Sequence, residues 1–284
     1  VPTEVVSLGA PVALPTEKRP RPATPEIEVA ELRDPAADSK PTKMDEARAV
    51  VARARAAVEA MTTYQVQLNR QERVGDVLQP AEDVQLSIRR NPRAVRLEWT
   101  TGSHKGREAI YSASEPGALL HVHMGDSPIP VPNLSMAPDS VMVMKNSRHP
   151  ITEAGFDTIV KTLETGLTAP AAGSTLTYVG VETPEAVGRP CHKIERHNAA
   201  GETWLVYLDA QTALPALVEG TSANGDLLER YRFLDVKPNL PDLAAAEAFD
   251  PAKRWPSVVS GGLLGRLART TVGDAKSADT AAPR

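Results

Sequence analysis

The sequence TWLVYLDAQTALPALVEGTSANGDLLERYRFLD, residues 203–235, decides the fold. It holds three runs rich in β-branched, aromatic and aliphatic residues, at 204–208, 214–219 and 227–234. The segment DAQT separates the first two runs, and Asn224-Gly225 supplies the left-handed backbone that a tight hairpin turn needs. Three short runs joined by turns predict an antiparallel meander. The stretch itself indicates no catalytic chemistry.

Strict alternation of apolar and polar residues continues on both sides of the meander. It is clearest where Val84, Leu86 and Ile88 alternate with Gln85 and Ser87. Alternation with this period indicates strands that have one buried face and one solvated face. Further strands are predicted at 64–69, 95–99, 107–112, 119–124, 175–182 and 191–197.

Two segments follow a helical period instead. In residues 43–61, apolar side chains recur every three or four positions among Ala, Arg and Glu, which are good helix formers. Residues 153–165 repeat this pattern, with Thr152 as the expected N-cap and Gly166 as the expected end. Each apolar stripe needs a sheet to pack on, so the sequence predicts an α+β fold.

The composition is that of an ordinary globular protein. The chain has 284 residues, of which 41% are hydrophobic and 24% charged, enough for a sizeable core. Its formal net charge is -4, its basic residues are scattered, and it has only three Phe and three Trp, so nucleic-acid binding is not indicated. Cys191 is the single cysteine, which excludes an intramolecular disulfide.

The two ends of the chain differ in composition from the middle. Residues 1–41 hold eight of the 25 prolines, and we expect a disordered Pro-rich tether over 1–42. Residues 257–284 are expected to be a mostly disordered tail with a short helix at 263–268. One folded domain is therefore predicted over 43–256. Because the sequence opens on Val and has no apolar run of the roughly 18 residues that a membrane helix needs, we expect an exported protein whose signal peptide has been removed.

One histidine pair is a candidate metal site. His121 and His123 lie two residues apart in a predicted strand, so both rings project from the same face. Asp126, His104 or His149 could complete a ligand set. The alternative is a pair of exposed histidines on the solvated face of the strand, and it is the interpretation we favour.

Cys191 is a candidate thiol nucleophile with His192 beside it. Adjacent residues of a strand point to opposite faces, which argues against a Cys–His pair. A buried cysteine that acts as a small hydrophobe is the favoured interpretation. The sequence also contains no phosphate-binding loop, nucleophile elbow, HExxH or CxxC motif.

Two stretches resemble a family of exported bacterial proteins of unknown function. They are residues 89–112, RRNPRAVRLEWTTGSHKGREAIYS, and residues 146–155, NSRHPITEAG. The first carries the recurring "KGRE" pattern at 105–108, and the second carries an "N-R-x-P-I-T-x-x-G" pattern, with Ser147 inserted and His149 where an aromatic residue is usual. The resemblance covers most of residues 44–250 and implies no established activity.

Residues 191–249 resemble the C-terminal half of the periplasmic lipoprotein-carrier superfamily (LolA/LolB-like). The resemblance rests on the spacing of C-x-x-I-E, W-x-V-Y-L-D and G-D-L-L-E-R-Y-R-F-x-D-V-K-x-N. It implies an open antiparallel β half-barrel with helices covering its concave face. Members carry acyl chains or lipoproteins, and some sense them within envelope-stress regulators.

An apolar groove between the sheet and the helices is the expected ligand site. Met136, Met142 and Met144 would add adaptable apolar surface there, although such residues are also common in plain core. The helices at 43–61 and 153–165 and the loop at 125–138 would gate entry. The expected cavity wall consists of Leu97, Trp99, Leu120, Val122, Met142, Met144, Leu205, Tyr207, Tyr231 and Phe233.

The expected function is that of an exported, non-enzymatic carrier or sensor that holds a lipid or acylated ligand. Its expected partners are a lipid or an acylated protein and an envelope protein, in the periplasm, with no cofactor and no nucleic acid. Two alternatives stay open at this point. One is an envelope protein-interaction module with a closed cavity, and the other is a metal-dependent enzyme centred on His121 and His123.

Overall fold

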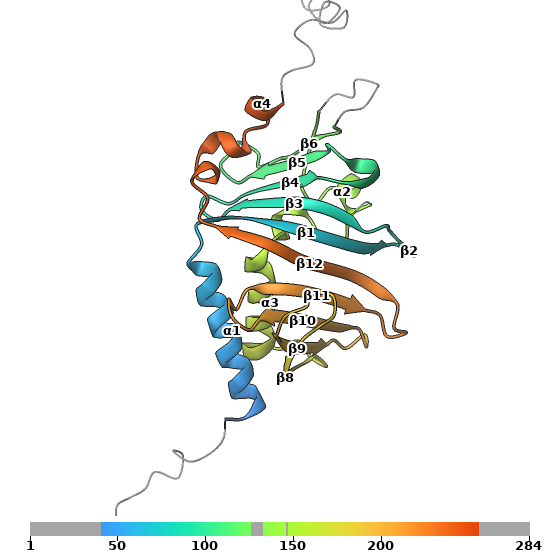
Figure 1. The fold of residues 1–284 in the computed structure, drawn as a ribbon. Coiled ribbons are helices and arrows are strands. Elements are labelled where there is room, and N and C mark those ends of the chain that lie inside the picture. Colours follow the sequence, from blue (N-terminus) through green and yellow to red (C-terminus); the bar gives the residue numbers. More distant parts are fainter. Residues whose placement is uncertain (1–40, 126–132, 146, 256–284) are drawn as a thin grey trace, which may run out of the picture. The chain divides into compact units, whose positions relative to one another are not determined.

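The computed structural model describes residues 41–125, 133–145 and 147–255 (Figure 1). The expected tether up to residue 40, half of the expected 125–138 loop and the expected tail with its 263–268 helix lie outside the described residues.

The described chain forms one large sheet in which every strand pair is antiparallel. The order across the sheet is β7-β6-β5-β4-β3-β1-β12-β11-β10-β9-β8, and β2 pairs with β1 beside this path. The first and last strands therefore meet in the middle of the sheet. The strands are β1 (Thr63–Val74), β2 (Val77–Leu78), β3 (Glu82–Arg89), β4 (Ala94–Trp99), β5 (Glu108–Ser112), β6 (Leu120–His123), β7 (Leu134–Met136), β8 (Thr175–Glu182), β9 (Cys191–His197), β10 (Thr203–Asp209), β11 (Pro215–Thr221) and β12 (Leu227–Pro238).

Helices α1 and α3 cover the concave face of this sheet, as the α+β half-barrel prediction requires (Figure 1). Helix α1 (Lys43–Glu59) begins with a capping box between Thr42 and Asp45, and it packs against α3 (Phe156–Thr168) and β8. Its buried stripe, which includes Val51 and Val58, joins one core with the inner residues of the sheet. The fold is an open antiparallel half-barrel with helices inside its curve.

Helix α3 differs from the prediction at both ends. Thr152 lies in a separate 3-10 helix (Ile151–Glu153), and Gly155, at φ +99°, takes the N-cap position of α3. The Phe156 N–H then donates to the Tyr64 hydroxyl at 2.9 Å. A Cβ at Gly155 would lie 2.3 Å from that hydroxyl, so both the φ angle and the close approach favour glycine. At the other end the helix runs past Gly166 to Thr168.

The segment that follows β12 covers part of the convex face. It consists of two 3-10 helices (Pro241–Leu243 and Ala246–Phe249) and α4 (Pro251–Arg254). We call residues 241–255 the convex cover. Its Leu243, Phe249 and Trp255 form a small core with Ala94 and Ile110 of the sheet.

Candidate ligand cavity

A cavity of about 620 Å³ lies between the concave face of the sheet and the chain from β7 to α3. We call residues 134–145 and 147–163 the concave cover; besides β7 it includes the one-turn helix α2 (Val141–Met144) and the first turns of α3. The volume lies within the range of about 300–1,000 Å³ that is typical of small-molecule sites. Its apolar wall includes Leu68, Leu86, Leu97, Trp99, Leu120, Val122, Met136, Val143, Ile159, Leu163, Val206, Val218 and Phe233.

Seven of the ten expected wall residues line this cavity. They are Leu97, Trp99, Leu120, Val122, Met142, Tyr231 and Phe233. The chain also places Met136 in the wall, whereas α1, which was expected to gate entry, contributes no lining residue among those described.

The structure corrects the prediction for three expected wall residues. Leu205 and Tyr207 lie on the convex face, where they line a shallow groove beside Pro184 and Leu217. Their neighbours Trp204 and Val206 line the cavity instead, because side chains alternate between the two faces of β10. Met144 does not line the cavity, since successive residues of the one-turn helix α2 point in different directions.

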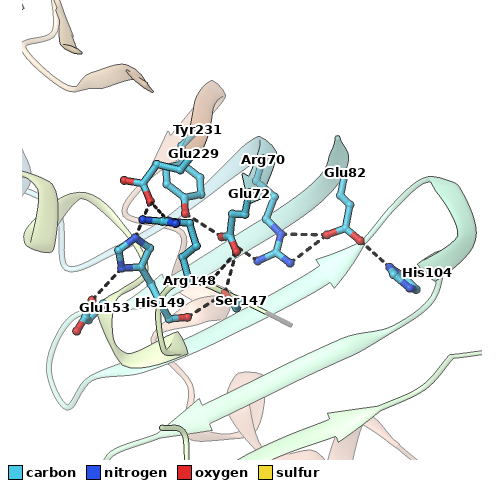
Figure 2. Close-up of polar contacts among 10 residues, drawn as sticks. All are labelled: Arg70, Glu72, Glu82, His104, Ser147, Arg148, His149, Glu153, Glu229 and Tyr231. Carbon is cyan, nitrogen blue, oxygen red and sulfur yellow. Dashed lines mark hydrogen bonds and ion pairs between the residues drawn. The ribbon is translucent and has the colours of Figure 1, made fainter. Parts of the chain in front are cut away.

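A row of polar residues crosses the concave face at one end of the cavity (Figure 2). The strand register places Glu72 of β1 opposite Glu229 of β12, and places Arg70 opposite both Glu82 and Tyr231. We call these five residues the polar rim. The side chains of Glu72 and Glu229 are only 6% and 7% exposed, so each carboxylate needs partners inside the protein.

The concave cover supplies several of those partners (Figure 2). The Arg148 backbone N–H donates to Glu72 Oε2 at 3.0 Å, and the Arg148 Nε donates to Glu229 Oε2 at 3.2 Å. His149 Nε2 lies 2.8 Å from the same Glu229 oxygen. The sheet completes the set, since the Tyr231 hydroxyl donates to Glu72 Oε1 at 2.8 Å. The two carboxylates thus fasten the concave cover to the sheet.

These contacts also set the protonation of His149 and Glu229, which join the concave cover to the polar rim. Burial alone would raise the pKa of the Glu229 carboxyl, but hydrogen bonds from His149 and Trp204 and the charge of Arg148 hold that pKa below its ordinary value. The Glu229 hydrogen bond in turn raises the pKa of His149, against the effect of burial. The pair therefore favours a charged imidazolium beside a charged carboxylate.

The other half of the rim is a chain of charges. Arg70 Nη2 lies 3.0 Å from Glu82 Oε2, and Arg70 Nη1 lies 3.6 Å from Glu72 Oε1. His104 Nδ1 lies 2.6 Å from Glu82 Oε1. Every carboxylate of the rim therefore has a cationic or hydrogen-bonding partner, which is the pattern of a structural network rather than of a free catalytic acid.

Two arginines that line the cavity have a different environment. The Arg107 guanidinium carbon lies 5.7 Å from the Trp99 ring centroid, and that of Arg196 lies 4.9 Å from the Trp204 ring centroid. Neither forms an ion pair with a carboxylate of the described chain. In the sequence, Arg107 belongs only to the KGRE motif and Arg196 carries no signal, because alternation identifies apolar faces and not the partners of charges.

The candidate metal site is not assembled. His121 Nε2 lies 2.7 Å from Glu115 Oε2, while His123 Nδ1 lies 2.9 Å from Asn133 Oδ1 and its ring stacks on Trp255 at 5.4 Å. Each ring thus has its own partners, on the face opposite the cavity-lining Leu120 and Val122 of the same strand. Within the described ranges there is no group of three or more His, Cys, Asp or Glu residues that could hold a metal ion.

Cys191 and His192 also have separate partners. The Cys191 thiol donates to the Arg189 carbonyl at 3.4 Å, and His192 Nδ1 lies 2.8 Å from the Tyr178 hydroxyl. Burial raises the pKa of the Cys191 thiol, which disfavours the thiolate that a nucleophile requires. The pair therefore offers no activated nucleophile.

None of the helices in the described part of the chain combines the length and the apolar character that crossing a membrane demands.

Several solved structures resemble this chain remotely. An uncharacterized conserved protein from Thermus thermophilus gives a TM-score of 0.43 at 12% identity, covering 74% of this chain and 94% of that chain. The Mycobacterium tuberculosis lipoprotein LppX gives 0.41 at 15% identity, covering 69% and 96%. A LolA superfamily protein from Nitrosomonas europaea gives 0.31 at 11% identity, covering 69% and 95%. At these scores the likenesses assign neither a ligand nor an activity to this chain.

Sequence comparison identifies the family. No curated protein matches this chain in sequence. One family model, however, matches residues 61–255, which include all twelve strands, the polar rim and both covers. The two stretches that carried the sequence resemblance, 89–112 and 146–155, lie inside this range. The chain belongs to the family described as Protein of unknown function (DUF1571).

Proposed function

We propose that this protein binds a lipid or an acylated ligand in the cavity and acts as a carrier or sensor rather than as an enzyme. The observation that supports this most directly is the cavity itself. Its wall is mostly apolar, its volume is about 620 Å³, and polar groups gather at one end. This distribution fits an amphiphile, whose acyl chain needs apolar surface and whose head group needs polar surface.

The free energy of binding would come mainly from burial of the acyl chain. Each methylene group removed from water contributes about 0.8 kcal/mol. The polar rim would contribute little to that affinity, because its carboxylates already have partners within the protein. Its role in this proposal is to hold the concave cover over the cavity.

We also propose that the protein works outside the cytoplasm. Resemblance of the sequence to exported envelope proteins supports a location outside the cytoplasm, where a carrier could take its ligand from a membrane. The partner in this proposal is a lipid or an acylated protein, and the folded region 43–256 would carry the binding activity.

Native mass spectrometry followed by solvent extraction tests the proposal. Protein purified from cells should carry a mass that extracts as lipid in a substantial fraction of molecules. A variant with Ile159→Glu should lose most of that mass, by about tenfold or more, because a carboxylate in an apolar wall is costly unless it is paired. Lys161→Glu, on the exposed side of the same helix, is the matched control and should retain the ligand.

A wild-type protein that stays without bound mass after incubation with lipid vesicles would contradict the proposal. Such a protein that instead co-purified with an envelope protein would support the interaction-module alternative. Loss of ligand in both helix variants would indicate a damaged fold rather than a blocked cavity, and circular dichroism would separate these cases.

A further inference from the structure

Arg107 occupies a position that the β4–β5 hairpin fixes firmly. The Trp99 N–H donates to the Arg107 carbonyl at 2.9 Å, and the Gly106 N–H donates to the Trp99 carbonyl at 2.9 Å. Alternation along this part of the chain puts Arg107 on the same face as Ala109, and both line the cavity with Trp99. The guanidinium therefore sits over an aromatic wall of the cavity and not in bulk solvent.

The Arg107 side chain lacks the carboxylate partners that Arg70 and Arg148 have. Its Nε is buried and has no hydrogen-bond partner in the described structure. Glu82 is the carboxylate whose charge acts on it, but Glu82 is already paired with Arg70 at 3.0 Å and with His104 at 2.6 Å. Burial lowers the pKa of Arg107, yet an arginine stays charged at neutral pH. The result is a cation at the cavity wall with unused donors.

The other arginines that line the cavity differ from Arg107 in their partners. Arg70 and Arg148 line the same cavity, and each has a carboxylate partner on the rim. Arg196 also lacks an ion pair within the described chain, but it has no buried nitrogen without a partner. Leaving a buried donor unsatisfied costs free energy, and an anion that supplies the missing acceptor would recover it.

We propose that Arg107 binds the anionic head group of the ligand, a carboxylate or a phosphate, while the acyl chain extends across Trp99 into the apolar wall. This inference rests on the proposed function and names the class of ligand, which is an anionic amphiphile. The guanidinium fork suits both anions, since it can donate two parallel hydrogen bonds to either. The strand register supports the path of the chain, because Leu97, Ala109 and Val122 lie side by side across β4, β5 and β6.

Affinity measurements on the full chain with three probes test this assignment. The probes are palmitic acid, its methyl ester, and 1-palmitoyl lysophosphatidic acid, each titrated by calorimetry. We expect the wild-type protein to bind the acid or the lysophosphatidic acid about tenfold or more tightly than the ester, as a charge-assisted hydrogen bond predicts. In R107Q the anion preference should vanish while the affinity for the ester stays within about twofold of the wild-type value. A stronger preference for the phosphate probe would identify a phospholipid as the natural source, and a stronger preference for the acid would identify a fatty acid.

Three further variants sharpen the test. R107K keeps the charge and should retain part of the preference, whereas R230Q removes an arginine from the convex groove and should leave all three affinities unchanged. R196Q should also preserve the preference. If R196Q abolished it and R107Q did not, the assignment to Arg107 would be wrong.

The failure of this inference differs from the failure of the proposed function. Equal binding of acid, lysophosphatidic acid and ester by the wild-type protein would overturn the role of Arg107 but leave the carrier proposal standing. Absence of binding for all three probes would overturn both. If R107Q does not fold, the wild-type comparison still tests the preference for anions, and R107K and R196Q still test its assignment to Arg107.

Discussion

The two faces of strands β4 and β5 carry different side chains, and the chain covers them in different ways: the convex face holds Arg96, Glu98 and Glu108 beside its apolar residues, whereas the concave face is mostly apolar. On the convex face, Ala94 and Ile110 lie in a small core with Leu243, Phe249 and Trp255. On the concave face, Leu97 and Trp99 border a cavity of about 620 Å³. Figure 1 shows the convex cover, in orange and red, lying near β3, β4 and β5.

The two covers are also attached by different contacts. The convex cover is attached along its length, since the Arg89, Arg96 and Arg254 side chains reach Ala245, Ala248 and Glu108 respectively. The concave cover is attached at separate places: β7 pairs with β6, Phe156 and Val160 of α3 are buried in the main core, and Arg148 and His149 contact the polar rim. The cavity lies where the concave cover leaves space over Leu97 and Trp99, whereas the convex cover packs directly on Ala94 and Ile110.

The largest effect that this comparison predicts is on stability. Leu243→Ala in the convex cover should lower the free energy of unfolding by about 3 kcal/mol, because Leu243 is 5% exposed and its removal leaves a void in a filled core. Leu134→Ala in the concave cover is the matched substitution and should cost less than about 1 kcal/mol, because Leu134 is 37% exposed and borders existing space. Urea unfolding of both variants measures the difference. Equal costs would mean that the two faces are filled alike.

The next effect concerns the ion pairs of the two faces. Glu229→Gln on the concave face should lower the free energy of unfolding by about 2 kcal/mol, because it leaves Arg148 and His149 without their charged partner. Glu219→Gln breaks an ion pair of 2.7 Å with Arg230 on the convex face and should cost less than about 1 kcal/mol, since the Glu219 side chain is 25% exposed whereas that of Glu229 is 7% exposed. Denaturant titrations of the two variants measure these free energies of unfolding. Amphiphile binding should be measured on the same variants. A Glu229→Gln variant as stable as Glu219→Gln would show that the rim does not hold the concave cover.

Much of the fold follows from local sequence signals. The three strands expected within 203–235 are β10, β11 and β12, and the Asn224-Gly225 turn joins the last two, with Gly225 at φ +86°. Alternation was sufficient because each strand has one filled or half-filled face. Helix α1 likewise begins at the expected residue, since Thr42 and Asp45 form a local capping box.

Features that depend on distant residues did not follow from the sequence. The start of α3 is set by Tyr64, which is 92 positions from the Phe156 N–H that it accepts, so the local Thr152 signal was misleading. The face of β10 was also undetermined, because Trp204, Leu205, Val206 and Tyr207 are all apolar enough to be buried. Both outcomes depend on which part of the chain lies opposite, and no local pattern encodes that.

The cavity shows the same division between local and distant information. The expected wall residues on β4, β6 and β12 line it because those strands alternate clearly between apolar and polar positions. The polar rim was not expected, since it arises only when Glu72 and Glu229, far apart in sequence, meet across β1 and β12. The unpartnered state of Arg107 is likewise a property of the assembled face, because its sequence neighbour Glu108 pairs with Arg254 on the convex side.

The smallest expected effect is a difference in pH dependence between the two covers. The convex cover is tied by Arg254 and Glu108 at 2.8 Å, and both of these groups keep their charge between about pH 5.5 and 8.5. The concave cover is tied in part by His149, whose pKa is raised above its ordinary value of 6.5 by the hydrogen bond to Glu229. Since the folded-state pKa lies above the unfolded one, this contribution to stability is complete below about pH 6.5 and is lost as the pH rises through the folded-state value.

The measurement is the free energy of unfolding of the wild type minus that of His149→Gln, at about pH 5.5 and about pH 8.5. We expect the larger difference at the lower pH, by less than about 1 kcal/mol, because the imidazole is 46% exposed and solvent screens its charge. Glu229 stays ionised over this range because its pKa is held low, so it adds no opposing slope. When Glu229→Gln is already present, adding His149→Gln should change the free energy of unfolding by an amount that no longer varies with pH. This result would distinguish the effect of His149 from that of the other histidines. If the pH dependence survived in that background, the imidazole would be responding to Glu153, which lies 3.3 Å from its Nδ1, and the rim would not control the attachment of the concave cover.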